Sequence, residues 1–283
     1  MAKQTTIYKE ISIEGIGLHT GKESKIVFKP SLDDKGIRFV RVDLEQKTEI
    51  EANWRNAVSS QAVRGSVIKK DDAFVYTIEH ILASAHAFGI DNLTVEINCS
   101  EPPILDGSAK MFAKALLEAG IKELESDKLY YTVREPMRFE IGKSKYCVFP
   151  CDRLEIDCTI SFDHPFLQVQ HFTIAQIDKD SFINEIAPAK TFCFDYEIEA
   201  LRKNGLALGG SMDNAIVIGI NGIHNEEPLR YGDEFVRHKV LDLVGDLYLA
   251  GRGIKGQIVA ERPGHKNNID FVREFVKKAE LVK

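Results

Sequence analysis

The chain of 283 residues has no run of 18 apolar residues, so no segment has the composition of a membrane-spanning helix. It also has no basic excess: 37 Lys and Arg stand against 43 Asp and Glu, and the net charge of −6 argues against a general nucleic-acid surface. Its N-terminal residues lack the apolar core of a signal peptide. We therefore expect a cytoplasmic protein that neither spans a membrane nor binds nucleic acid, and we expect it to act as a monomer.

Cysteine is scarce and odd in number. The five cysteines lie in apolar, strand-like segments, which argues against a disulfide framework. They are Cys99, Cys147, Cys151, Cys158 and Cys193. Cys147 and Cys151 are close enough in sequence to suggest metal ligands, but no matching second pair accompanies them. We expect all five to be reduced and structural.

One long helix is predicted between Pro228 and Gly251, which supply a start signal and a stop signal. Between 235 and 249 the apolar residues surround the helix instead of following one stripe, which predicts burial on most sides. Four ionisable residues nevertheless lie in this stretch: His238, Lys239, Asp242 and Asp246. Burying an unpaired charge costs on the order of several kcal/mol, so something must compensate these four.

The spacing within this helix suggests one form of compensation. His238 and Asp242 are four residues apart and lie on the same face, where an imidazole and a carboxylate can hold one divalent metal. Asp246, one turn further, can orient a neighbouring group. A buried His–Asp hydrogen bond together with a Lys–Asp pair satisfies the same pattern. Two ligands do not make a catalytic zinc site, because a third ligand and an open position are also needed.

A second helix is predicted over residues 77–89, with Thr77 as its N-cap and a glycine as its C-cap. Glu79 and His80 fall in its first turn, where polar groups can face a cleft. Adjacent Glu and His resemble the pair of the zincins, in which one residue binds metal and the other acts as a base. No second histidine stands at the zincin spacing, and His86 is expected on the surface.

The order of elements predicts an α+β fold, because strands, helix, strand and helix do not alternate as in a doubly wound sheet. The expected strands cover 8–16, 24–29, 36–42, 92–98, 129–133, 137–141, 146–149, 154–161, 168–174 and 257–260, with weak strands in 47–66. Further helices are expected over 110–119, 196–203 and 269–278. The charged segment 123–128 is interpreted as a linker. The apolar, glycine-rich loop 205–211 either contacts an apolar ligand or folds against the core.

Seven segments in this order resemble the zinc-dependent UDP-3-O-acyl-N-acetylglucosamine deacetylases of lipid A biosynthesis in Gram-negative bacteria. They are 15–21, 77–82, 103–108, 190–194, 209–214, 236–247 and 264–265, and the resemblance runs from about residue 10 to the last helix. It implies two similar α+β domains, each a layered β-α-α-β sandwich, with the active site at the domain interface. The implied domains are 1–126 and 127–283, the second carrying an insert for an acyl-chain passage.

The resemblance supplies the third ligand: His80 joins His238 and Asp242 in binding Zn²⁺, with Fe²⁺ as an alternative ion. It implies hydrolysis of the N-acetyl group of UDP-3-O-acyl-N-acetylglucosamine to a free amine and acetate. Glu79, beside His80, is then expected to take a proton from the attacking water as general base.

Three further catalytic residues follow from the resemblance. The hydroxyl of Thr191 is expected to stabilise the oxyanion. His265, on the turn formed by Gly264, is expected to be protonated and to stabilise charge or protonate the leaving amine. Asp246 is expected to orient His265 and keep it charged.

The expected partner is the UDP-linked acylated amino sugar. Lys239 is expected to bind it, and Phe192 is expected to lie against the sugar. Leu206, Leu208 and Gly210 belong to the apolar loop that would form the acyl-chain passage.

The chain departs from the family pattern in two places. Residues 61–65 stand where a Thr-Thr-Leu-Gly-like stretch is expected, and Lys266 stands where a small residue is common. The chain is too short for the forms fused to a dehydratase. Two other functions remain open: a zinc amidohydrolase for another N-acyl sugar, and a binding module with a structural metal. Structural zinc sites usually have four protein ligands, so three ligands and a base favour an enzyme.

Overall fold

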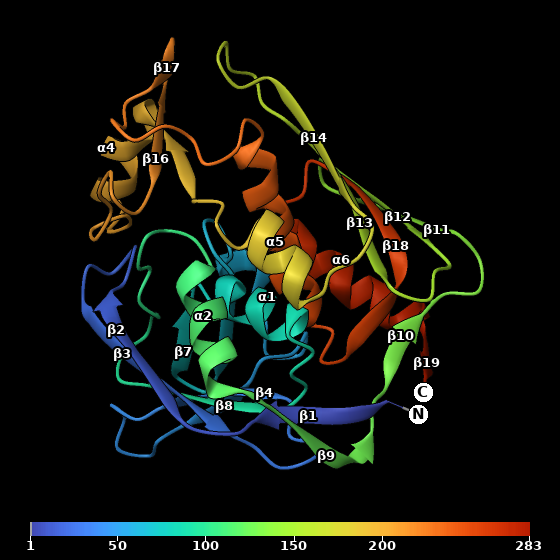
Figure 1. Ribbon diagram of the computed structural model, residues 1–283. Helices are drawn as coiled ribbons and strands as arrows, with labels where there is room; N and C mark the ends of the chain where they lie inside the picture. The colour runs from blue at the N-terminus through green and yellow to red at the C-terminus, as the bar shows by residue number, and fades with distance from the viewer. Residues whose placement is uncertain (1) are drawn as a thin grey trace.

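A layer of helices separates two β-sheets in the computed structural model, which describes residues 2–283 (Figure 1). The arrangement is mixed α+β, as the order of elements predicts. Among the described residues, no helix is both long enough and apolar enough to cross a membrane.

The first sheet has five strands in the order β2-β3-β8-β4-β5, with β4 and β8 parallel and the other pairs antiparallel. The strands are β2 (Ile11–Ile16), β3 (Glu23–Pro30), β4 (Ile37–Arg41), β5 (Glu49–Glu51) and β8 (Leu93–Ile97). Alternate residues such as Ile26 and Phe28 are fully buried, because one face packs under helices α1 (Glu79–Ala87) and α2 (Lys110–Ala119). Helix α2 ends at Gly120, whose φ of 71° suits a glycine.

The second sheet is built around β18 (Gly253–Glu261), which pairs with β12 along one edge and with β10 and then β13 along the other. With six further strands beside β18, this sheet has seven strands. The partners are β10 (Tyr130–Thr132), β11 (Met137–Ile141), β12 (Ser144–Phe149), β13 (Leu154–Ser161), β14 (Val169–Ile174) and β19 (Glu280–Val282). Helices α5 (Glu234–Tyr248) and α6 (His265–Lys278) lie on its inner side (Figure 1).

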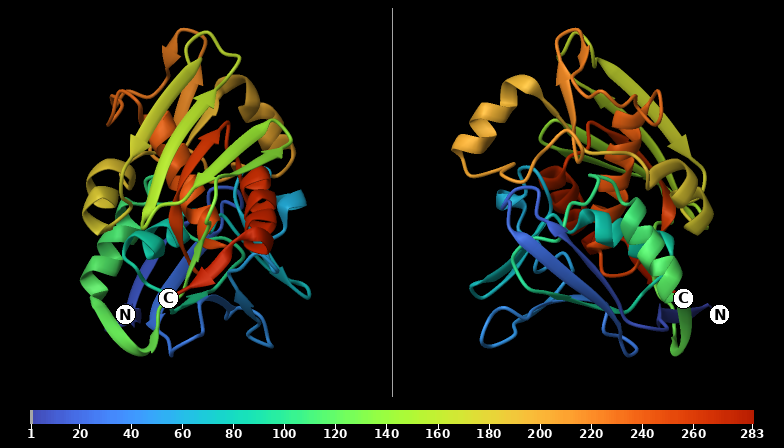
Figure 2. Two further views of the ribbon diagram at one scale, coloured as in Figure 1. Left: turned by 90° about the vertical axis from the view of Figure 1, so that its right-hand side faces the viewer. Right: turned by 60° about the vertical axis from the view of Figure 1, so that its left-hand side comes forward.

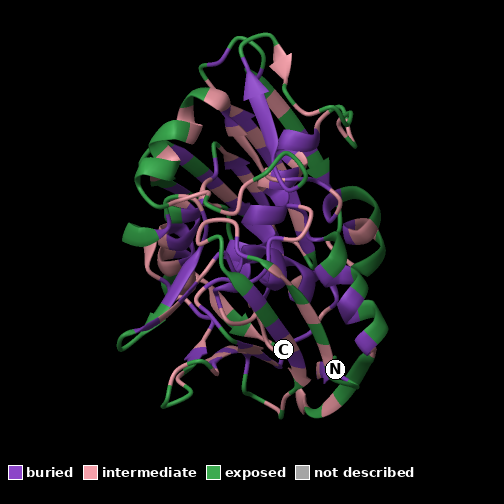
Figure 3. Cartoon of the chain, turned by 90° about the vertical axis from the view of Figure 1, so that its left-hand side faces the viewer, coloured by how far each residue is buried: buried purple, intermediate pink, exposed green. Residues whose placement is uncertain are grey.

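Helix α5 is the buried centre of the molecule, as its apolar residues predict (Figure 3). Of its residues, only Arg237 and Lys239 escape full burial. It packs closely on α1, and a side-chain carbon added at Gly245 would overlap the backbone carbonyl of Glu79. The glycine thus permits the approach that brings the first turn of α1 to α5.

A smaller unit projects from one end of the body (Figure 2). It follows the short helix α3 (Lys179–Ser181) and the π-helical turn η2 (Phe182–Ile186). It contains β15 (Phe192–Phe194), α4 (Asp195–Lys203), β16 (Ile216–Gly219) and β17 (Gly222–Ile223), and its three strands form a sheet. The predicted helix 196–203 corresponds to α4.

Two predictions near the N-terminal sheet are wrong. The expected strand 8–16 begins too early, because residues 8–10 lie in the bend between β1 (Lys3–Ile7) and β2, which covers only 11–16. The expected linker 123–128 lies mostly in β9 (Ile121–Asp127), which pairs with β1. None of the side chains of β9 is fully buried, so its charges stay hydrated and the apolar alternation typical of strands is missing.

Residues 47–66 contain β5 and the 3₁₀ turn η1 (Ser59–Gln61), and the hairpin of β6 (Val67–Lys70) and β7 (Ala73–Tyr76) that follows was not predicted. Thr77 does not cap α1: its φ is 54°, and its hydroxyl donates to Glu101 at 3.0 Å. Helix α6 starts at His265 instead of residue 269, with Gly264 as its N-cap. His265 is therefore a helical residue and not a turn residue.

His86 is half-buried, whereas an exposed surface position was expected. Its ring packs edge-on against Tyr248 with centroids 4.9 Å apart, and its Nδ1 is buried without a hydrogen-bond partner among the described residues. All five cysteines are free, as expected.

Candidate active site

A cavity of about 280 Å³ brings together residues from α1, α5, α6 and the smaller unit. Its polar end is formed by the predicted metal ligands and catalytic residues, and its other end is apolar. Every predicted catalytic residue except Asp246 lines it, and Asp246 lies behind His265.

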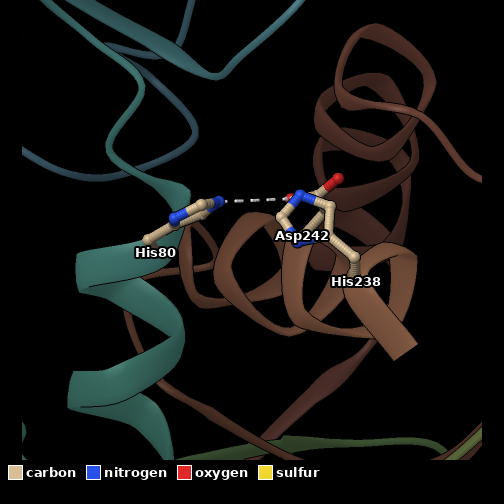
Figure 4. Close-up of side chains that lie close together, drawn as sticks. All are labelled: His80, His238 and Asp242. Carbon is tan, nitrogen blue, oxygen red and sulfur yellow. Dashed lines mark ion pairs between the residues drawn. The ribbon is translucent and has the colours of Figure 1, made fainter. Parts of the chain in front are cut away.

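His80, His238 and Asp242 point toward one another from two helices (Figure 4). Nε2 of His238 lies 3.4 Å from Asp242 Oδ1, and Nε2 of His80 lies 3.8 Å from the same oxygen. The Nδ1 of His238 faces the carbonyl oxygen of Ala189 at 3.0 Å, so this nitrogen donates and leaves Nε2 as the free lone pair. Helices α1 and α5 thus face each other and bring three ligand atoms close together.

The charge states of these three groups suit a divalent cation. Burial and the nearby His238 lower the pKa of His80 to about 3, and burial lowers the pKa of His238, so both imidazoles are neutral. Burial opposes ionisation of Asp242, but the charge of Lys239 is the largest of the effects that outweigh it and hold its pKa below the ordinary value. Its Oδ1 is buried with no hydrogen-bond partner in the described chain. Two neutral imidazoles and an orphaned carboxylate oxygen are a donor set that fits zinc.

Glu79 and His265 face each other beside this group, with Glu79 Oε1 and His265 Nε2 3.8 Å apart. The backbone N–H of Ser66 donates to Glu79 Oε2 at 2.9 Å. Burial raises the pKa of Glu79 to about 7. A side-chain carbon at Gly65 would lie 3.0 Å from Glu79 Oε1, so the loop before β6 packs tightly on this carboxylate.

His265 is held by Asp246, whose Oδ2 lies 3.0 Å from His265 Nδ1. Burial would lower the pKa of His265, but Asp246, Glu79 and Asp242 outweigh it and raise the pKa to about 9. Glu79, Asp242 and His265 also place oxygen and nitrogen atoms within 4.8 Å of one another. A protonated imidazole cannot bind a metal, so the group with His80 and His238 is the better cation site.

Two residues that complete this network were not predicted. Asn268 donates to Asp246 Oδ2 at 2.8 Å, and the hydroxyl of Ser66 donates to Asp246 Oδ1. Asn268 comes three residues after His265, a spacing that places both on one helix face, but it becomes visible only once α6 is known to start at His265. Ser66 has no sequence signal of this kind.

The predicted substrate contacts Phe192, Lys239 and Gly210 line the cavity beside the predicted catalytic residue Thr191. The ammonium group of Lys239 donates to Asp242 Oδ2 at 2.6 Å and lies 5.6 Å from the ring centre of Phe192. Lys239 therefore connects the cation site with the aromatic wall.

Leu206 and Leu208 do not line the cavity, contrary to the prediction. Leu208 is 55% exposed, and its backbone N–H donates to the carbonyl of His19 at 3.2 Å. The apolar end is instead lined by Leu18, Val63, Ile198, Leu201, Met212 and Val217. Ile198 and Leu201 are three residues apart in α4, so the helix supplies part of that wall, and Ala207, Gly210 and Ser211 of the following loop also line the cavity.

Comparison with known proteins agrees with this arrangement. A family model described as UDP-3-O-acyl N-acetylglycosamine deacetylase matches residues 4–277. The UDP-3-O-acyl-N-acetylglucosamine deacetylase of Syntrophotalea carbinolica is 41% identical over 280 residues, which cover 99% of this chain and 90% of the relative. That of Methylococcus capsulatus is 40% identical over 278 residues, covering 98% and 91%.

A bifunctional enzyme LpxC/FabZ of Chlorobaculum tepidum is 39% identical over 305 residues, which cover 98% of this chain but 65% of that protein. The likeness thus extends over nearly the whole chain, and the resemblance found in the sequence is confirmed. The chain belongs to the UDP-3-O-acyl-N-acetylglucosamine deacetylase family.

Proposed function

We propose that this protein is a deacetylase that hydrolyses the N-acetyl group of UDP-3-O-acyl-N-acetylglucosamine in lipid A biosynthesis. The observation that carries the proposal is one cavity holding a cation-type ligand set, a facing carboxylate and imidazole, and an apolar end. Relatives that carry this name share about 41% of their residues over nearly the whole chain. The residues of the polar end can catalyse amide hydrolysis, and the apolar end can accommodate the acyl chain of the substrate.

His80, His238 and Asp242 would hold the metal ion, which we propose to be zinc, with iron(II) as the alternative. When bound, such an ion polarises a carbonyl and acidifies water, the two needs of amide hydrolysis. A set of three protein ligands is typical of catalytic zinc sites, whereas structural zinc sites usually have four.

The chain's own residues then divide the proton transfers. Glu79 lies beside the cation group and accepts the proton of the attacking water. His265 faces the same point and, held by Asp246, donates a proton to the departing amine. The water's hydroxyl goes to the acetyl carbon, the C–N bond breaks, and acetate and a free amine leave. The hydroxyl of Thr191, on the cavity wall, stabilises the oxyanion.

The same proposal assigns the substrate's parts to the cavity. Lys239 and Phe192, adjacent to the cation group, contact the sugar nucleotide, and Gly210 lies on the way to the apolar end. The acyl chain occupies that end against α4. We also propose the finer architecture implied by the family: two similar α+β domains, residues 1–126 and 127–283, with the site between them. The boundary between the two domains then falls at the end of β9.

The test is an assay of the purified protein with UDP-3-O-acyl-N-acetylglucosamine, following the free amine and acetate together with bound metal. We expect one amine per acetate and a requirement for a divalent ion. UDP-N-acetylglucosamine and simple N-acetyl sugars, which lack the acyl chain, should be poor substrates. Equal turnover of a simple N-acetyl sugar would favour the alternative amidohydrolase, and no turnover of any of them by metal-loaded protein would overturn the proposal.

A further inference from the structure

Arg64 lies in the stretch 61–65 that departs from the family pattern, and its side chain lines the catalytic cavity. Its Nη2 donates to Glu197 Oε1 at 2.6 Å, a short charge-assisted hydrogen bond. The side chain of Arg64 is 33% exposed and that of Glu197 is 24% exposed, so the pair is partly shielded from water. Arg64 lies in the loop after η1 and Glu197 lies in the first turn of α4, so the two residues are far apart in the sequence.

Glu197 uses both carboxylate oxygens. While Oε1 accepts from Arg64, Oε2 accepts from the backbone N–H of Phe194 at 3.2 Å at the start of α4. Within the described chain, the Arg64–Glu197 pair is the one hydrogen bond or ion pair that joins α4 to residues 2–127. The neighbouring contacts of Leu208 and Gly209 with the loop at 18–19 come after the helix has ended.

The pair spans the apolar end of the cavity. Ile198 and Leu201 of α4 line the cavity from the smaller unit, and Val63, next to Arg64, lines it together with Leu18 from residues 2–127. Few other polar contacts hold α4, which projects from the body (Figure 2). The contact between Arg64 and Glu197 therefore restrains the position of this wall, together with the packing of α4 on β15 and β16.

We propose that the Arg64–Glu197 bridge fixes α4 at a set distance from the opposite wall and thereby determines which acyl-chain lengths the enzyme accepts. Arg64 is a positioning residue in this role, because it acts through α4 and not on the reacting atoms. The inference rests on the proposed function for its substrate, but the bridge itself can be tested without turnover.

The variants are Arg64→Met, which keeps a long side chain but removes the charge, Glu197→Gln, which keeps an acceptor for Phe194, and the double variant. The control is Lys203→Met, which breaks an exposed ion pair with Glu199 within α4 and leaves the bridge intact. Amide hydrogen exchange of residues 198–203 should be faster in the bridge variants than in the control. Unchanged exchange in both bridge variants would overturn the proposal.

The second measurement is kcat/KM for a series of straight acyl chains of increasing length. A partly exposed ion pair supports a change of up to about fivefold, so the difference between preferred and disfavoured lengths should shrink by that factor. The double variant should change no further, because both substitutions remove one interaction. High salt should move the wild-type profile toward that of Arg64→Met but leave the variant's profile unchanged.

The outcomes separate the two proposals. An equal loss of kcat/KM for all chain lengths would show a structural effect only and would overturn the selectivity role. If the wild-type protein deacetylates no acylated UDP-sugar, the proposed function fails, and the exchange measurement still decides whether the bridge holds α4.

Discussion

Asp242 is an ionised carboxylate at the centre of a buried helix, and its surroundings explain how the fold tolerates it. One oxygen accepts from Lys239 at 2.6 Å, while the other faces two neutral imidazoles and has no hydrogen-bond partner in the described chain. An unpaired buried oxygen is costly, so the site gains most from a cation at that oxygen. The sequence places a charged residue in a helix that is otherwise predicted to be buried, and the cation site explains this placement.

Glu79→Gln separates proton transfer from metal binding. Gln can still accept the hydrogen bond from Ser66 but cannot take a proton from water. We expect the variant to keep its metal and to lose roughly 10²–10⁴-fold in kcat, the usual range for a positioned base. Metal analysis and the deacetylation assay measure the two effects, and near-normal kcat would remove Glu79 from the mechanism.

His86 predicts a pH dependence of stability. Burial, followed by the charge of Lys128, lowers the pKa of His86 from 6.5 to about 4 in the folded protein. The unfolded chain therefore binds this proton more readily, so the stabilisation is present above about pH 6.5 and is lost as the pH falls toward 4.

His86→Leu removes this titration. Urea unfolding at several pH values should show a shallower loss of unfolding free energy between pH 6.5 and 4 than in the wild type, by on the order of 1–3 kcal/mol. His171→Leu, at an exposed position of β14, is measured beside it as the control for replacing a histidine by leucine. A parallel slope for His86→Leu and wild type would contradict the assignment.

Among the elements, the contact between α1 and α5 sets the geometry of the site, because α1 contributes Glu79 and His80 and α5 contributes the other ligands. Gly245→Ala would place a methyl group against the carbonyl of Glu79. We expect a loss of about 1–3 kcal/mol of unfolding free energy, as for overpacked cores, together with lower activity. The control is Gly232→Ala, where no heavy atom lies within 4 Å of the added carbon. If the two variants have equal unfolding free energies, α1 moves away from the added methyl group without a loss of stability.

The periodicity of apolar residues predicted the elements whose role is packing. It failed where functional polar residues occupy inward positions and interrupt the pattern. Helix α2 was placed correctly at Lys110–Ala119 because its apolar stripe is regular. The first turn of α6 was missed because His265 and Asn268 face the buried Asp246, so polar residues occupy inward positions. Strand β9 was missed for a different reason: its partner β1 lies far away in sequence, and no local pattern encodes that pairing.

At the scale of the whole molecule, the site exists only when distant parts of the chain meet. The i, i+4 spacing indicated His238 and Asp242 as a pair, but no spacing connects them to His80, which only the resemblance to a family supplied. Arg64, Ser66 and the wall of α4 also carry no local signal, because their roles arise from contacts across the cavity. The monomeric state and the cytoplasmic location stay predictions.

Because the ligands come from α1 and from α5, a bound metal joins two parts of the fold. An ion that binds only the folded state stabilises it by about 2.7 kcal/mol at a concentration of 100 times its Kd. Removing the ion with a chelator should therefore lower the Tm by several degrees, and adding Zn²⁺ should restore it. His238→Ala removes one ligand but leaves the His80 and Asp242 positions in place. This variant should hold less metal, and its Tm should respond little to either treatment. The exposed His171→Ala should respond as the wild type does. If His238→Ala retains a full equivalent of zinc and the wild-type response, the ion lies elsewhere, and the ligand set proposed for the junction of α1 and α5 is wrong.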